Sequence, residues 1–212
     1  MKNRHGWELD TEWIFSTHGL VNGAAVCIET FSNPGDHIVL FTPVYHSFFK
    51  VIKAASREIL ECPLIKNHGR YEFDFNSYDN LMTGKEKIVL LCSPHNPGGR
   101  VWSKEELKQV ADFTKRHNLI LISDEIHHDI VYPGAIHIPM ANVDEEISDR
   151  LIMMTATTKT FNIAGAHTGN VIIPDKNLRQ KFVKKMSALG MSPNSFGLFM
   201  ACLLYTSPSP RD

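Results

Sequence analysis

The chain has 212 residues, of which 43% are hydrophobic and 21% are charged, which is enough to bury a core of ordinary size in one domain or two small ones. Its formal net charge of -1 offers no basic surface for a nucleic-acid backbone and no polybasic anchor for a membrane. No apolar run in the sequence is long enough to span a bilayer. We therefore expect neither nucleic acid nor a membrane among its partners.

The cysteines are scattered along the sequence. Cys27, Cys62, Cys92 and Cys202 include no close pair at the spacing of metal ligands. This pattern favours reduced thiols over a disulfide framework, and a reducing compartment keeps thiols in that state. We expect a cytoplasmic protein without a cysteine-bound metal.

Short apolar runs alternate with amphipathic segments, which is typical of repeated βαβ units and a mostly parallel sheet. The predicted elements are, in chain order, a helix over 22–31, strands over 37–41 and 88–92, a helix from about 104 to 118, a strand over 119–123 and an apolar run over 150–156. Ser103 and Glu106 form the pattern of a capping box at the start of the second helix. The expected fold class is α/β.

Polar side chains follow three of these apolar runs. Asn96 comes after the 88–92 strand, Asp124 ends the 119–123 strand, and Lys159 follows the 150–156 run. In open α/β sheets, ligands bind where the carboxyl ends of the strands converge. The sequence thus predicts an amide, a carboxylate and an amine near one site, although a lysine near a carboxylate is usually only a surface ion pair.

Four motifs occur in a familiar order: Pro43-Val-Tyr45, Ser93-Pro-His-Asn-Pro-Gly98, Ser123-Asp-Glu-Ile-His127 and Thr158-Lys-Thr-Phe-Asn162. Together they resemble the class I/II aminotransferase superfamily of fold type I, and most closely its MalY/PatB-type cystathionine β-lyase branch. The resemblance implies the pyridoxal-phosphate (PLP) transferase large domain, with a mostly parallel central sheet flanked by helices. It also implies pyridoxal 5'-phosphate as cofactor and an amino acid as the small-molecule substrate.

The resemblance assigns a role to each matching residue. Lys159 would hold the cofactor as a Schiff base and then remove the substrate's α-proton. Asp124 would pair with the pyridine nitrogen and keep it cationic. Asn96 would bond the ring oxygen and Tyr45 would stack on the ring, although a turn asparagine and a buried loop tyrosine need no function. Glu125, the next residue along a strand, is expected to face away as a structural carboxylate.

The phosphate is expected to bind where Gly19, Leu20 and Val21 lead into the first predicted helix. The hydroxyl of Thr158 is a further candidate ligand, and the neighbouring hydroxyls of positions 155 and 157 are not distinguished from it. Where many relatives have an arginine eight residues after the lysine, this chain has His167, so that role is not carried over.

His127 stands where many aminotransferases have a tyrosine that touches the cofactor's ring oxygen, and the resemblance gives it that place. Asp124, His127 and His128 also have spacing that suits a divalent metal. The strand before Asp124 disfavours that alternative, so we expect no metal site there, and His128 is expected at the surface or behind the site.

The leading functional hypothesis is a carbon–sulfur β-lyase that converts cystathionine or a related cysteine S-conjugate to pyruvate, ammonia and a thiol. An aminotransferase would use the same residues, and a non-catalytic cofactor-binding or regulatory protein remains a further alternative. A dinucleotide-binding domain would need a Gly-x-Gly-x-x-Gly turn, which the sequence lacks.

The resemblance also implies boundaries. Residues 1–201 would form an incomplete large domain, without an N-terminal segment and without a small C-terminal domain that carries the carboxylate-binding arginine. Residues 202–212 resemble translated sequencing adapter, and a natural Ser/Pro-rich terminal tail is the alternative. We expect the fragment to be inactive alone, and its full-length parent to be a homodimer.

Overall fold

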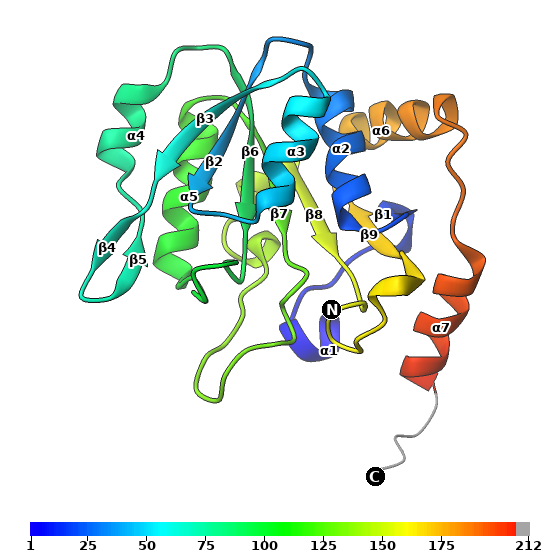
Figure 1. Ribbon diagram of the computed structural model, residues 1–212. Helices are drawn as coiled ribbons and strands as arrows, with labels where there is room; N and C mark the ends of the chain where they lie inside the picture. Colours follow the sequence, from blue (N-terminus) through cyan, green and yellow to red (C-terminus); the bar gives the residue numbers. More distant parts are fainter. Residues whose placement is uncertain (207–212) are drawn as a thin grey trace.

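The structure is a computed structural model that describes residues 1–206 (Figure 1). The expected adapter-like tail therefore lies outside the described residues from position 207 onward, and its first part, 202–206, continues the last helix. The helices are α1 Lys2–His5, α2 Leu20–Phe31, α3 His46–Ala54, α4 Phe75–Leu81, α5 Lys104–Arg116, α6 Lys176–Ala188 and α7 Ser195–Thr206. The strands are β1 Ile14–Thr17, β2 His37–Thr42, β3 Glu58–Pro63, β4 Ile65–Asn67, β5 Arg70–Glu72, β6 Glu86–Cys92, β7 Ile120–Asp124, β8 Leu151–Thr155 and β9 Gly169–Ile172. Short 3-10 helices cover Thr11–Trp13, Met140–Asn142, Glu145–Asp149 and Ala164–Ala166.

The central sheet has 7 strands in the order β1-β9-β8-β7-β6-β2-β3. The strands from β8 to β3 are parallel to one another, whereas β9 runs antiparallel to both β8 and β1. A separate hairpin pairs β4 with β5. The expected α/β class and the mostly parallel sheet are confirmed, and the antiparallel edge is an addition that the sequence pattern did not predict.

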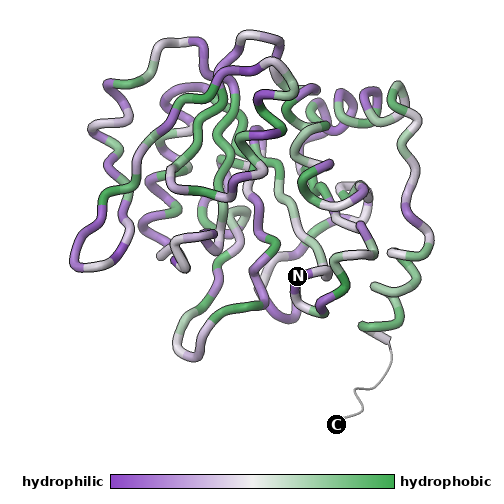
Figure 2. Tube along the Cα trace, in the orientation of Figure 1, coloured by the Kyte–Doolittle hydropathy of each residue, from purple (hydrophilic) through white to green (hydrophobic). Residues whose placement is uncertain are grey.

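Helices cover both faces of the sheet because the side chains of each strand alternate between the faces. In β6, Val89 and Leu91 join the core under α5, while Ile88 and Leu90 join the core under α2, α3 and α6. Both faces of the central strands are therefore apolar, as Figure 2 shows by the hydrophobic colour of these strands. Within residues 1–206, no helix combines the length and the apolar character that crossing a bilayer requires.

The predicted capping box at the start of α5 is present. The Ser103 side chain accepts from the Glu106 N–H at 3.2 Å, and the Glu106 carboxylate accepts from the Ser103 N–H at 2.8 Å. The helix ends at Arg116, and Asn118 turns the chain into β7 with a φ of 51°. These local signals explain why the predicted helix and strand boundaries are close to the observed ones.

The start of α2 differs from the prediction of residue 22. The helix begins at Leu20, with Gly19 as its N-cap at a φ of 86°, a backbone conformation that glycine adopts without steric cost. Close packing also positions this end, since a Cβ on Gly169 at the start of β9 would lie 2.6 Å from the Leu20 Cδ2. The first turn of α2 thus packs closely against the start of β9.

Candidate cofactor site

A pocket of about 290 Å³ lies at the carboxyl ends of the parallel strands. Its lining residues are His18, Gly19, Leu20, Val21, Tyr45, Cys92, Asn96, Asp124, Ile126, His127, Lys159, Ala164 and His167. This set contains every residue that the sequence singled out for cofactor binding except Thr158. A more open cavity of about 580 Å³ adjoins the pocket and shares Asn96 and His127 with it.

The N-terminus of α2 forms one wall of the pocket. Gly19 has no side chain to cap the helix, so the first-turn N–H groups of Leu20 and Val21 have no N-cap partner. The Asn22 side chain instead accepts from the His18 N–H, at 3.3 Å. Free N–H groups and the positive end of the helix dipole favour an anion at this wall.

Asp124 supplies a carboxylate from the end of β7, where it is only 6% exposed. Its Oδ1 accepts from the Ile126 N–H at 3.1 Å. Burial raises the pKa of Asp124 to about 7, the negative charge of Glu125 adds to this rise, and the Ile126 N–H and the positive charge of Lys159 oppose it. A cation placed against this carboxylate would favour its ionised form.

Glu125 faces away from the pocket, as expected of the next residue on the strand. It is fully buried and accepts from the Ser123 hydroxyl at 2.9 Å, from the Met140 N–H at 2.9 Å and from the His137 Nε2 at 2.8 Å. These bonds make it a structural carboxylate that anchors the segment after β7.

Asn96 lies on a loop whose conformation is held by several contacts. The Asn96 N–H donates to the Cys92 Sγ at 3.3 Å. The His95 Nε2 lies 2.8 Å from the carbonyl of Pro43, which ties this loop to the segment that carries Tyr45. The Tyr45 ring in turn packs edge-on against Phe48, with ring centroids 5.6 Å apart. The amide and the aromatic ring are thus positioned by the same loop contact.

Lys159 lies in the turn after β8, with its side chain at the surface of the pocket. Backbone hydrogen bonds close this turn, from the Phe161 N–H to the Thr157 carbonyl at 3.0 Å and from the Ile163 N–H to the Thr158 carbonyl at 3.0 Å.

Burial lowers the pKa of His127, and the charges of Lys159 and His128 lower it further. His127 therefore presents a neutral imidazole beside the lysine at neutral pH.

Thr158 does not line the pocket. It is buried, and its backbone carbonyl serves the turn around Lys159. The side chains of Thr155 and Thr157 line a different cavity, of about 430 Å³, beside α1. A hydroxyl contact from these threonines to a group in the pocket has no support in the observed lining.

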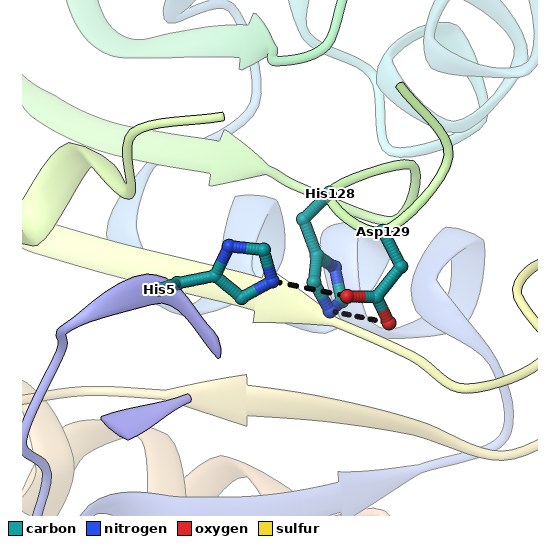
Figure 3. A group of neighbouring side chains, drawn as sticks. All are labelled: His5, His128 and Asp129. Atoms are coloured by element: carbon teal, nitrogen blue, oxygen red, sulfur yellow. Dashed lines mark hydrogen bonds and ion pairs between the residues drawn. The ribbon is translucent and has the colours of Figure 1, made fainter. Parts of the chain in front are cut away.

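The structure separates the residues of the alternative metal site. Asp124 and His127 line the pocket, but His128 turns away toward His5 and Asp129, as Figure 3 shows. His128 is only 6% exposed, so the surface position considered for it is wrong. Its Nδ1 donates to the Glu125 carbonyl at 2.6 Å, which fixes the ring behind the site.

Sequence reasoning missed several lining residues, among them His18, Cys92 and His167. His18 directly precedes the helix entry at Gly19, so its proximity to that wall could have been read from the chain. His167 stands where many members of the family that the motifs resemble have an arginine, and its side chain lines the pocket. Cys92 gave no signal in the sequence, because a strand cysteine is usually a small core residue.

The chain is similar to proteins of a known family. The family model described as aminotransferase class I and II matches residues 1–204. The chain belongs to this family. It is 34% identical to cystathionine β-lyase PatB of Bacillus subtilis (strain 168), over 99% of this chain and 55% of that protein.

Solved structures of such enzymes share the fold. The crystal structure of cystalysin from Treponema denticola, which contains a pyridoxal 5'-phosphate cofactor, superposes with a TM-score of 0.94 at 40% identity, over 98% of this chain and 53% of that chain. N-succinyldiaminopimelate aminotransferase from Mycobacterium tuberculosis superposes with a TM-score of 0.86 at 26% identity, over 97% of this chain and 53% of that chain. The chain therefore spans about half the length of the relatives that it matches.

Proposed function

We propose that the pocket binds pyridoxal 5'-phosphate and that the protein is a carbon–sulfur β-lyase acting on cystathionine or a related cysteine S-conjugate. The observation that carries the cofactor assignment is the convergence of a buried carboxylate, an amine and an uncapped helix N-terminus on one pocket of about 290 Å³. These groups match the three polar features of the cofactor, namely a ring nitrogen, an aldehyde and a phosphate. The residues that line the pocket thus fit pyridoxal 5'-phosphate.

Each group has a role that follows from its position. The N–H groups of Leu20 and Val21 bind the phosphate, because they are directed outward from the positive end of α2. Asp124 holds a proton on the ring nitrogen by charge pairing, which its burial strengthens. Tyr45 and Asn96 orient the ring through stacking and through a hydrogen bond to its oxygen.

Lys159 has two tasks in this proposal. Its Nζ would hold the cofactor, and its free amine would accept the proton from the substrate's α-carbon. When bound, pyridoxal phosphate supplies an electron sink for the charge left at that carbon. The neutral imidazole of His127 lines the same pocket as the lysine and would hydrogen-bond the ring oxygen of the cofactor.

The lyase assignment, rather than amino-group transfer, is supported by the similarity to PatB and cystalysin, which exceeds that to the aminotransferase. Further support comes from the adjoining cavity of about 580 Å³, which provides room beside Asn96 and His127 for a bulky substrate side chain. An aminotransferase is the second candidate, because the same residues serve both reactions.

Borohydride trapping tests the cofactor site. A protein containing this chain, reduced in the presence of pyridoxal phosphate and digested, should carry the label on the peptide with Lys159. The Lys159→Ala variant should carry none, while Lys176→Ala, a change on the surface helix α6, should be labelled like the wild type. A label on another lysine would contradict the assignment.

Product analysis tests the reaction. The full-length parent should release pyruvate and free thiol from cystathionine and should convert 2-oxo acids to amino acids only slowly. Efficient amino-group transfer without thiol release would move the assignment to the aminotransferase.

We propose further that residues 1–201 are part of a large domain, that the substrate-carboxylate arginine belongs to the rest of the parent, and that the parent is a homodimer. The isolated chain should then show at least a hundredfold less pyruvate release, since a lost substrate clamp misplaces the α-proton.

A further inference from the structure

His5, His128 and Asp129 form a compact group outside the cofactor pocket (Figure 3). His5 ends α1, whereas His128 and Asp129 follow β7, so the tertiary fold brings them together across more than half of the chain. One ligand atom from each lies within 4.8 Å of the others, and no other group of this kind occurs among residues 1–206. We propose that these three side chains bind a divalent transition-metal ion such as Zn²⁺.

The distances suit a small tetrahedral ion. The Nε2 of His5 lies 3.0 Å from the Asp129 Oδ1, and the Nε2 of His128 lies 3.4 Å from the Asp129 Oδ2. Ligands bonded to zinc at about 2.1 Å in tetrahedral geometry are separated by roughly 3.4 Å. Both distances, one to each oxygen of Asp129, are close to this separation, and the three ligand atoms lie within 4.8 Å of one another. Two imidazoles with one carboxylate are ligands that such ions prefer.

The orientation of His128 is the strongest argument. A carbonyl can only accept, so the 2.6 Å contact from His128 Nδ1 to the Glu125 carbonyl places the ring proton on Nδ1. In the neutral ring, Nε2 then carries a lone pair, and it faces the Asp129 carboxylate, which is also an acceptor. A cation between these two acceptors removes their repulsion. A backbone carbonyl behind a metal-binding histidine is also the usual outer partner of such a ligand.

The remaining groups around Asp129 allow an ion. Thr160 donates to Oδ2 at 3.1 Å, and the Arg4 Nη1 lies 3.1 Å from the same oxygen. The Arg4 side chain is 53% exposed and can turn into solvent, whereas the Asp129 side chain is only 2% exposed. The metal bond would replace the contact between His5 Nε2 and Oδ1, and the single proton of the neutral His5 ring would then lie on Nδ1.

A fourth ligand position has access to water. His128 lines the cavity of about 430 Å³ beside α1, so an ion at its Nε2 can be reached from that cavity. Thr157 belongs to the same cavity wall, and its buried Oγ1 has no hydrogen-bond partner within residues 1–206. A water on the ion offers a partner in this cavity for such an oxygen. The backbone of His5 is also held in place, because the Asn142 side chain donates to the His5 carbonyl at 3.0 Å.

Metal titration of the chain tests the proposal. After treatment with EDTA and removal of the chelator, the protein should bind one Zn²⁺ per chain by calorimetry, and Co²⁺ should give the visible bands of a tetrahedral site. His5→Gln and His128→Gln should each weaken binding at least tenfold. His5 is the safer variant for folding, because it lies in the short helix α1 at the chain's start.

His117→Gln is the matched control. His117 also contacts a carboxylate, with its Nε2 2.6 Å from the Asp79 Oδ1, but in the described part of the chain it belongs to no group of three possible metal ligands. The His117→Gln variant should bind Zn²⁺ like the wild type. Zn²⁺ should raise the melting temperatures of the wild type and of His117→Gln, and it should leave the melting temperature of His5→Gln unchanged. Absence of Zn²⁺ binding by the folded wild type, or undiminished binding by His5→Gln, would overturn the proposal. The exposed Cys202 thiol is the main competing ligand, and binding there would not respond to the histidine variants.

Discussion

At the scale of single residues, Asp124 is a carboxyl group that destabilises the folded chain when it is ionised. Burial raises its pKa from 3.8 to about 7, so the folded state binds its proton more tightly than the unfolded state does. The resulting contribution to stability is fully present below the unfolded pKa of 3.8 and is lost as pH rises through about 7. The cofactor-free chain should therefore lose stability between these two values.

Asp124→Asn removes this titration. The variant should match the wild type at about pH 4 and should be more stable than it at about pH 8, by an amount on the order of 4 kcal/mol at most. Urea unfolding of the two proteins at both pH values measures the difference. Equal pH dependence of the wild type and the variant would show that the folded pKa is not raised.

Asp144→Asn provides a control of opposite sign. Hydrogen bonds from Lys108 and Lys115 hold the pKa of the Asp144 carboxyl well below its usual range. Its contribution to stability is present above the unfolded pKa and is lost as pH falls through the folded one. The Asp144→Asn variant should therefore be less stable than the wild type near neutral pH, with a smaller difference in acid.

At the scale of elements, the contact between α2 and β9 determines where the first turn of the helix lies. A Cβ on Gly169 would lie 2.6 Å from the Leu20 Cδ2 and 3.1 Å from the Gly19 carbonyl carbon. Gly169→Ala should therefore push the helix N-terminus out of place, with a destabilisation of about 1–3 kcal/mol. Because the same backbone binds the phosphate in our proposal, affinity for pyridoxal phosphate should fall about tenfold or more.

Gly165→Ala is the matched control for this prediction. A Cβ at Gly165 would meet nothing within 4 Å, and the residue has no positive φ. Its unfolding free energy and its cofactor affinity should stay close to those of the wild type. Urea titrations and the absorbance change on cofactor addition measure both quantities, and equal behaviour of the two glycine variants would remove the role of the α2–β9 contact.

At the scale of the whole molecule, α7 lies along one side of the fold as an apolar helix with little cover (Figures 1 and 2). Phe196 is 84% exposed and Phe199 is 69% exposed. Exposed aromatic side chains that gather on one surface favour self-association. The isolated chain should therefore aggregate as its concentration rises.

Replacing both residues, as Phe196→Ser with Phe199→Ser, should reduce light scattering and should change the free energy of unfolding by only about 0.5 kcal/mol. Phe182→Ala in α6 removes a fully buried ring and should cost about 3–5 kcal/mol. Scattering that persists in the double variant would place the self-association elsewhere.

Much of the fold follows from local chemistry. The capping box at Ser103 and the apolar runs over 88–92 and 119–123 correspond closely to α5, β6 and β7, because caps and periodic apolar residues act within a few neighbours. The first residue of α2 could not be predicted from local sequence signals, because the packing of Gly19 and Leu20 against β9 determines it. The antiparallel β9 was also missed, because strand direction depends on how the sheet closes at its edge.

The sequence by itself determined the α/β class, the family resemblance and the motif residues that line the pocket, such as Asp124 and Lys159. These residues follow strands of a parallel sheet, and the carboxyl ends of such strands necessarily meet at one edge. Only the tertiary structure decided that Thr158 lies outside the pocket lining and that His128 turns to meet His5. Such positions depend on how a loop folds back and on contacts between distant segments, and side-chain spacing along the chain carries no information about them.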